Sequence, residues 1–233
     1  MLCFWVFFGC NNNAESPLFS EEKASLNNFA CVEAVSEFRK GDILVRPNAN
    51  FLPGSSFVKN GFGFGHAVLV TQGFEHENTD SLLAGIVVVE SMAAKVHQDF
   101  QVREIKGFVE HSNPAFSNVS FHNKYKGNRY RLRLGLNEPQ IDSIIAFALS
   151  QKGSRSCWNA MKRFPENYED SEAGKMNWAD NHDWYCSLLV WQAVFYVTGI
   201  DLDVNGGYQV YPNDLVNHPL FDNTSEKRAR VRF

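Results

Sequence analysis

The chain has 233 residues, of which 44% are hydrophobic and 21% are charged, with a formal net charge of −4. This composition is typical of one globular domain, and the weak negative charge gives no electrostatic basis for binding nucleic acid or an anionic membrane. The five cysteines are odd in number and match neither a zinc spacing nor a disulfide framework, so we expect no metal and no cofactor.

The N-terminus begins with an apolar run from Met1 to Gly9, which Cys10 and three asparagines follow. The run resembles the end of a bacterial lipoprotein signal peptide, with Cys10 as the candidate for lipidation, and predicts a place on the periplasmic side of the cell envelope. It lacks positive charge and is too short to span a bilayer. The alternative is a disordered apolar tail on a cytoplasmic protein. We divide the chain into a signal-like tail with a linker, a main domain and a charged peripheral tail: residues 1–27, 28–222 and 223–233.

The first half of the main domain alternates between short apolar segments and polar connections. A short helix is expected within 28–38, and 47–65 and 73–84 are expected to be connections. Alternating and β-branched residues predict strands at 43–46, 66–72, 85–90, within 95–105 and at 130–134. An irregular stretch, 106–128, precedes the last of these strands.

Two helices dominate the second half. Glu138-Pro139 opens a helix that Gly153 ends, with apolar residues at helical spacing: Ile141, Ile144, Ile145, Phe147 and Ala148. After an exposed segment at 165–181, a second helix runs to Val197. Asp183 is its expected N-cap and Gly199 follows its C-terminus. A helix that is apolar on nearly every face is a buried one.

Cys186 falls in the first turn of this buried helix. The partial positive charge at a helix start stabilises a thiolate, so Cys186 is the candidate nucleophile. The alternative is a small buried core cysteine.

The strands at 66–72 and 85–90 predict an antiparallel pair in which Val68 faces Val88, Val70 faces Ile86 and His66 faces Glu90. Opposite side chains share a face of the sheet, at roughly 4.5–5.5 Å between Cβ atoms. A carboxylate on one ring nitrogen fixes the tautomer of a histidine and leaves the other nitrogen for a thiol proton. Cysteine, histidine and an orienting acid form a nucleophile, a base and its orienter. The alternatives are an edge histidine and a solvated glutamate.

Five segments share a pattern with a known family: Gly41-Asp42-Ile43-Leu44, Gly65-His66-Ala67-Val68-Leu69-Val70, Val88-Val89-Glu90, Tyr185-Cys186-Ser187-Leu188-Leu189-Val190 and Tyr211-Pro212-Asn213-Asp214-Leu215. Together they resemble the circularly permuted NlpC-like peptidases, the YiiX/YebB-like group of the papain-fold superfamily. The resemblance covers roughly residues 40 to 218.

The resemblance implies an α+β, papain-like fold with an antiparallel sheet against the helix that bears the cysteine. It implies Cys186 as nucleophile, His66 as base and Glu90 as the orienting residue. Backbone N–H groups at the helix start are expected to form an oxyanion hole, with Tyr185 and Gly65 as further oxyanion or substrate candidates. The expected reaction is hydrolysis of an amide, in a peptidoglycan peptide or a related molecule, through a thioacyl intermediate.

Other interpretations stay open. The same fold is compatible with an acyltransferase or lipid-acting thiol enzyme, with a non-catalytic binding module, and with a structural envelope lipoprotein. Gly61 to Gly65 offers a weak phosphate-loop pattern that lacks the following helix. His66, His182 and Asp183 are a zinc set without local ligand spacing.

Overall fold

The computed structural model describes residues 33–47, 64–92, 101–108, 129–157, 159–163, 183–222 and 229–233. The predictions about the signal-like tail and Cys10 lie outside these residues. So do those about the stretches 165–181 and His182, and most of 47–65 and 106–128.

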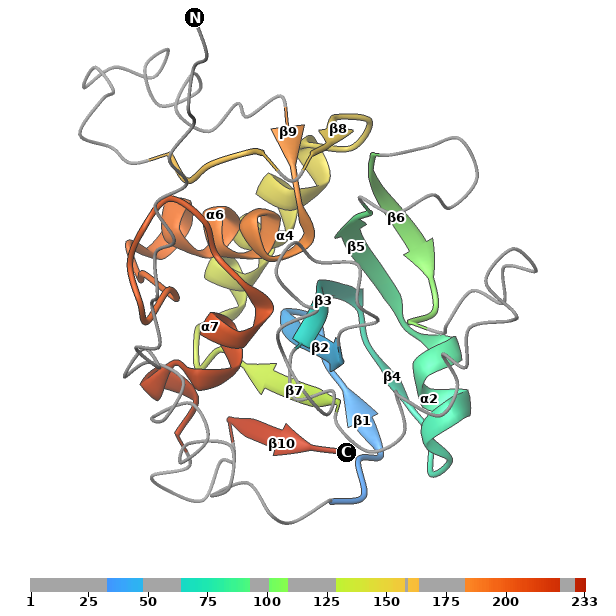
Figure 1. Ribbon diagram of the computed structural model, residues 1–233. Coiled ribbons are helices and arrows are strands. Elements are labelled where there is room, and N and C mark those ends of the chain that lie inside the picture. Colours follow the sequence, from blue (N-terminus) through green and yellow to red (C-terminus); the bar gives the residue numbers. More distant parts are fainter. Residues whose placement is uncertain are drawn as a thin grey trace, which may run out of the picture. The chain divides into compact units, whose positions relative to one another are not determined.

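The fold is a mixed α+β structure centred on a six-stranded antiparallel sheet, which agrees with the α+β class expected from the sequence (Figure 1). In spatial order its strands are β10 (Arg230–Arg232), β7 (Tyr130–Arg133), β2 (Asp42–Pro47), β3 (Phe64–Gln72), β5 (Val87–Ser91) and β6 (Val102–Lys106). Two small pairs accompany it: β1 (Glu37–Phe38) with β4 (Phe74–Glu75), and β8 (Arg155–Ser156) with β9 (Asp183–Trp184). The helices are α2 (Thr79–Gly85), α4 (Glu138–Ser150), α6 (Cys186–Thr198) and α7 (Pro212–Asn217), followed by the 3₁₀ turn η4 (Pro219–Phe221).

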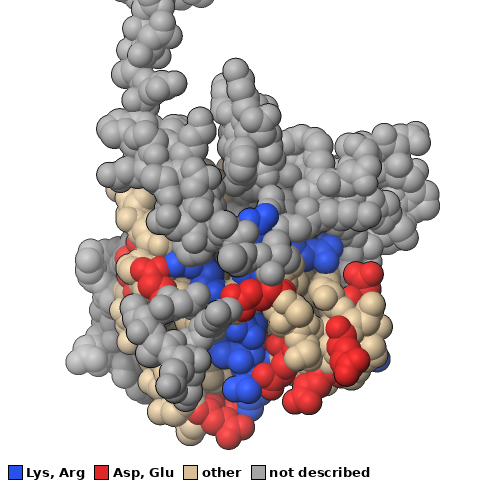
Figure 2. All heavy atoms as spheres, turned by 90° about the horizontal axis from the view of Figure 1, so that it is seen from below, with Lys and Arg blue, Asp and Glu red and all other residues tan. Residues whose placement is uncertain are grey.

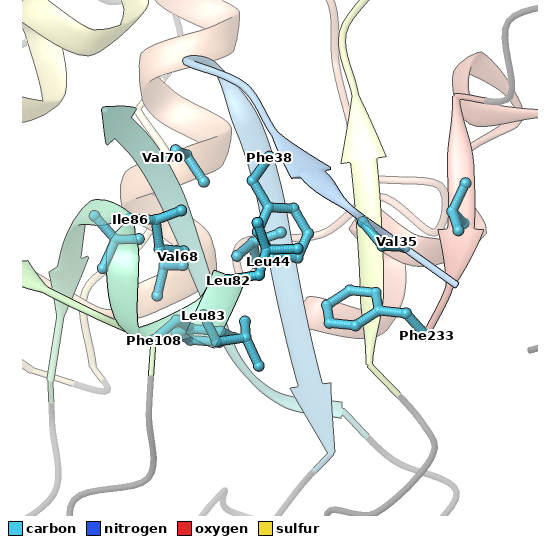
Figure 3. Close-up of a cluster of buried hydrophobic side chains, with 12 residues drawn as sticks. Val35, Phe38, Leu44, Val68, Val70, Leu82, Leu83, Ile86, Phe108 and Phe233 are labelled. Carbon is cyan, nitrogen blue, oxygen red and sulfur yellow. The ribbon is translucent and has the colours of Figure 1, made fainter. Parts of the chain in front are cut away.

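One face of the sheet packs against α2 and flanking aromatic residues. Because side chains alternate along a strand, Leu44 of β2 and Val68 of β3 point to the same side, where Leu82 and Leu83 of α2 meet them. Figure 3 shows these side chains in one cluster, and all four are at most 2% exposed. Alternate residues of β3 and β5, among them Val68, Val70 and Val88, therefore point toward this cluster.

The alternate residues of the same strands are buried as well, with Ile43, Ala67 and Val89 fully excluded from solvent. Helices α4 and α6 lie side by side next to the sheet, and α6 is in contact with β3 and β5 (Figure 1). A sheet covered on both faces needs continuous apolar strands, which explains the runs that the sequence shows.

The two long helices follow the sequence pattern closely. An Asn137 capping box opens α4, with Pro139 in its first turn. Helix α6 ends at Gly199, whose φ of 71° lies in the left-handed region that glycine adopts without strain.

Three segments differ from the prediction. Residues 33–38 hold strand β1 and no helix. The connection 73–84 contains β4 and most of α2, since the Asn78 side chain accepts the Ser81 N–H and caps a helix too short for a periodicity to reveal. At the C-terminus, residues 230–232 pair with β7 as an edge strand, so they belong to the sheet and not to a peripheral tail.

On the underside of the molecule, basic side chains lie beside acidic ones (Figure 2). The described residues include the ion pairs Arg39–Glu37 and Arg133–Asp42. None of the helices within the described residues combines the length and apolarity needed to cross a lipid bilayer.

Candidate active site

His66 and Glu90 form a buried pair on neighbouring strands. His66 lies near the start of β3 and Glu90 near the end of β5, with 6% and 4% of their surfaces exposed. The His66 Nε2 atom lies 2.6 Å from Glu90 Oε2, within hydrogen-bond distance. This contact occupies one ring nitrogen and leaves Nδ1 for another partner.

The strand register that brings them together is not the predicted one. Val70 pairs with Val88 and Leu69 with Val89, so the expected pairing of Val70 with Ile86 is wrong by two residues. Helix α2 extends to Gly85 and Ile86 is its C-terminal cap, which delays the start of β5. A shift by an even number of residues preserves the face on which each side chain lies. His66 and Glu90 therefore still share a face, as diagonal neighbours that the long glutamate side chain can bridge.

Cys186 is the third member of the group. It is the first residue of α6, is 2% exposed, and interacts with the His66 side chain, which acts to lower its pKa. The backbone N–H groups of Ala67 and Ser187 act on the pKa of the thiol in the same direction. A sulfur that receives backbone N–H groups at a helix start is placed where negative charge is stabilised.

The pKa shifts of Cys186 and His66 favour a state in which the thiol has given its proton to the imidazole. Burial acts to raise the pKa of Cys186, but the hydrogen bond and charge of His66 and the two backbone N–H groups outweigh it, so the pKa is lowered. Burial likewise acts to lower the pKa of His66, while the hydrogen bonds to Cys186 and Glu90 raise it. A lowered thiol pKa beside a raised imidazole pKa favours a thiolate next to an imidazolium.

Arg103 of β6 completes the group from the far side of Glu90. Its Nε and Nη2 atoms donate to Glu90 Oε1 at 3.0 and 2.8 Å, while Oε2 faces His66. Burial acts to raise the pKa of Glu90, but the His66 hydrogen bond and the charges of His66, Arg103 and Arg46 lower it from 4.5 to about 2. Glu90 is therefore a carboxylate at any physiological pH.

The residue after Glu90 connects β5 to the segment before α6. Ser91 Oγ donates to the Trp184 carbonyl at 3.0 Å and accepts from the Ser156 hydroxyl. Successive strand residues point to opposite faces, so one dipeptide contacts His66 on one side and the chain leading to Cys186 on the other. This contact fixes the start of α6 relative to the sheet.

The expected N-cap role of Asp183 is wrong. Asp183 lies in β9, and its carboxylate accepts the Arg155 guanidinium at 2.6 and 2.7 Å. Tyr185 occupies the N-cap position with no side-chain cap. The pairing of β8 with β9 keeps the backbone extended through Trp184. Helix α6 therefore begins at Cys186, two residues later than an N-cap at Asp183 would place it.

The Tyr185 hydroxyl accepts the Val210 N–H at 2.8 Å, and Ser187 Oγ donates to the Val210 carbonyl at 2.7 Å. These bonds attach the start of α6 to the loop before α7, where Asp214 accepts the Tyr211 N–H. Burial raises the pKa of Tyr185, so its hydroxyl stays protonated.

Gly65, the other oxyanion or substrate candidate, lies next to His66 in β3 and is half-buried. Its role and that of Tyr185 remain predictions.

Two residues beside His66 were not singled out from the sequence. Phe108 stacks on the imidazole, with 6.1 Å between ring centroids, and Arg46 lies 5.4 Å above the Phe108 ring. Arg46 pairs with His66 across β2 and β3. Aligning these two predicted strands could therefore have identified Arg46 as a neighbour of His66. In the same way, aligning β5 with β6 could have identified Arg103, which faces Glu90 directly.

Among the described residues, no three His, Cys, Asp or Glu side chains are grouped so as to hold a metal ion. His182 of the zinc set lies outside them, and Asp183 is paired with Arg155.

Comparison with known proteins gives distant similarities. No family model matches the chain. The uncharacterised protein YycO of Bacillus subtilis (strain 168) is 29% identical over 82 residues, which are 35% of this chain and about a third (33%) of that protein. The crystal structure of metalloprotein YiiX from Escherichia coli O157:H7 covers 83% of this chain and 88% of its own, with 10% identity and a TM-score of 0.42. Neither similarity assigns an activity to this chain.

Proposed function

We propose that the protein is a thiol hydrolase that cleaves an amide bond with Cys186, His66 and Glu90. The hydrogen bond between the His66 ring and the Glu90 carboxylate, together with the interaction of His66 with the Cys186 thiol, supports this proposal. The three residues come from three separate elements, and all are buried. Nucleophilic acyl transfer requires a nucleophile next to a base, and an acid that orients the base from its other side.

In the proposed reaction the Cys186 thiolate attacks the amide carbonyl, and the oxyanion faces backbone N–H groups at the start of α6. As the C–N bond breaks, the His66 imidazolium gives its proton to the leaving amine. Water then attacks the thioester while His66 takes a proton from it. Cleavage of the C–S bond restores the thiolate and releases the acid. Glu90 stays ionised throughout and stabilises the imidazolium.

The finer parts of the proposal rest on the family resemblance. They are a circularly permuted, papain-like NlpC relationship, a peptidoglycan peptide or related amide as substrate, and a place at the cell envelope with lipidation at Cys10. A buried helix that begins with the cysteine, next to an antiparallel sheet that carries the histidine and the acid, is compatible with the first of these.

The test is turnover of wall-peptide fragments and acylated amines by the wild-type chain and by Cys186→Ala. We expect hydrolysis by the wild type, its loss in the variant, and a covalent acyl adduct on Cys186 in the intact-mass spectrum. Cys157→Ala is the matched control, because Cys157 is the other free cysteine among the described residues and hydrogen-bonds through its backbone N–H. Full hydrolysis by Cys186→Ala would refute the proposal, and adduct transfer to an added amine in preference to water would indicate a transferase.

A further inference from the structure

We propose that Arg103 is a positioning residue that acts through Glu90 to set the reactivity of the Cys186 thiol. The proposal deepens the thiol-hydrolase assignment and rests on it, since it takes Cys186 as the nucleophile. The side chain of Arg103 hydrogen-bonds to the Glu90 carboxylate behind the ring, so we expect it to act on the thiol indirectly.

The first argument is geometric. Glu90 and Arg103 are direct partners across β5 and β6, so the backbone ladder holds their side chains together. The guanidinium donates through Nε and Nη2 to the single oxygen Oε1, which leaves Oε2 for His66 at 2.6 Å. Two donors on one oxygen fix the rotation of the carboxylate, and thereby the direction of the oxygen that faces the ring.

The second argument concerns charge. A carboxylate that is 4% exposed is costly unless it is paired, and the Arg103 side chain is only 20% exposed, so solvent screens the pair weakly. Without Arg103, the hydrogen bond to His66 and the charge of Arg46 must compensate the buried charge, and a neutral, protonated Glu90 becomes more favourable. A neutral Glu90 stabilises an imidazolium less well, so the proton returns to the thiol and the thiolate population falls.

The charged groups around Glu90 come from four elements. His66 lies on β3, Arg103 on β6 and Arg46 on β2, while Cys186 on α6 acts through the His66 ring. Of these, Arg103 donates two hydrogen bonds to Glu90, through Nε and Nη2. Arg46 adds charge from beside the Phe108 ring. Loss of Arg103 therefore removes both a charge and an orientation.

The experiment is the pH dependence of iodoacetamide alkylation at Cys186, followed by mass spectrometry of the modified peptide, which needs no substrate. We expect Arg103→Gln to lower the rate near pH 6 by about 10-fold, which corresponds to a rise of about one unit in the pKa of the thiol. The acid limb of the profile moves to higher pH. Arg103→Lys restores part of the rate, because it keeps the charge but not the two-pronged contact.

Two further variants separate positioning from mere folding. Glu90→Gln should reproduce the fall, and Glu90→Gln with Arg103→Gln should fall no further, because Arg103 acts through the carboxylate. Arg133→Gln is the matched control: its guanidinium pairs with a buried carboxylate across neighbouring strands, at 24% side-chain exposure, away from the thiol. Its profile should equal that of the wild type at a measured cost in stability.

The outcomes are distinct. A wild-type Cys186 no more reactive than a free thiol overturns both the proposed function and this inference. A reactive Cys186 whose profile is the same in Arg103→Gln, or in Arg103→Lys should the first variant not fold, overturns the inference alone. Additive losses from Glu90→Gln and Arg103→Gln do the same.

Discussion

Two carboxylate–arginine pairs in the sheet have similar strand positions and similar burial, and they differ in the groups that occupy the carboxylate oxygens. Asp42 faces Arg133 across β2 and β7, and Glu90 faces Arg103 across β5 and β6. Both carboxylates are buried, at 1% and 4% exposure, and both receive Nε and Nη2 of the arginine. The neighbouring groups therefore distinguish the two sites more than the pairs themselves do.

At Asp42 every bond goes to a permanent donor. One oxygen accepts Arg133 Nε, and the other accepts Arg133 Nη2 and the backbone N–H of Arg39, which closes the turn before β2. At Glu90 the arginine occupies one oxygen, and a titratable ring in contact with a thiol occupies the other. The first arrangement holds a turn and two strands. The second also couples the charge of the carboxylate to the proton of His66, which is the condition for a role in acid–base chemistry.

The largest effect expected from this comparison is on turnover. Glu90→Gln should lower kcat by about 10²- to 10⁴-fold, because it removes the charge that supports the imidazolium. Asp42→Asn should leave kcat of the folded protein unchanged and destabilise the fold by about 3 kcal/mol, since it leaves a partly buried guanidinium without its carboxylate. Kinetics at fixed folded fraction and denaturant unfolding of both variants measure the two effects. A large loss of kcat in Asp42→Asn would break the distinction.

The next effect is on stability in acid. The pKa of Glu90 is lowered from 4.5 to about 2, so the unfolded chain binds a proton there before the folded chain does. The stabilisation from this group is complete above about pH 4.5 and is lost as the pH falls toward 2; it amounts to about 3 kcal/mol. Urea unfolding between pH 6 and 2 should show this slope in the wild type and in Asp42→Asn, and a flatter one in Glu90→Gln. Equal slopes in all three proteins contradict it.

The sequence predicted those features that depend on local pattern. Strands at 43–46 and 130–134, the helix from Glu138 and the glycine after α6 are confirmed, because alternation, capping residues and glycine act within a few positions of the chain. The residue types of the site were found by chemistry, and the structure brings Cys186, His66 and Glu90 together while their catalytic roles remain predictions.

The features that the sequence missed depend on register and on pairing over long separations. Arg103 is recognisable only when β6 is aligned with β5. The predicted alignment of β3 with β5 was itself wrong by two residues, because α2 occupies part of an apparent loop. The last strand, β10, is short and charged, and its partner lies about a hundred residues earlier, so no local signal distinguishes it from a tail. Asp183 failed for a related reason, because the parallel pairing of β9 with β8 overrides a local capping preference.

The smallest effect expected is at Asp183, which lies three residues before the nucleophile and carries a third carboxylate–arginine pair. Its partner Arg155 is 70% exposed, so water screens the pair even though the geometry is two-pronged. Asp183→Asn should change the free energy of unfolding by less than about 0.5 kcal/mol and kcat by less than about twofold. A loss of about 1 kcal/mol, the usual cost of removing an N-cap, would instead indicate that Asp183 caps α6 in solution. In that case the surroundings of the carboxylate would no longer predict the effect of each pair, because the exposed Asp183 would stabilise the protein about as much as a buried carboxylate does.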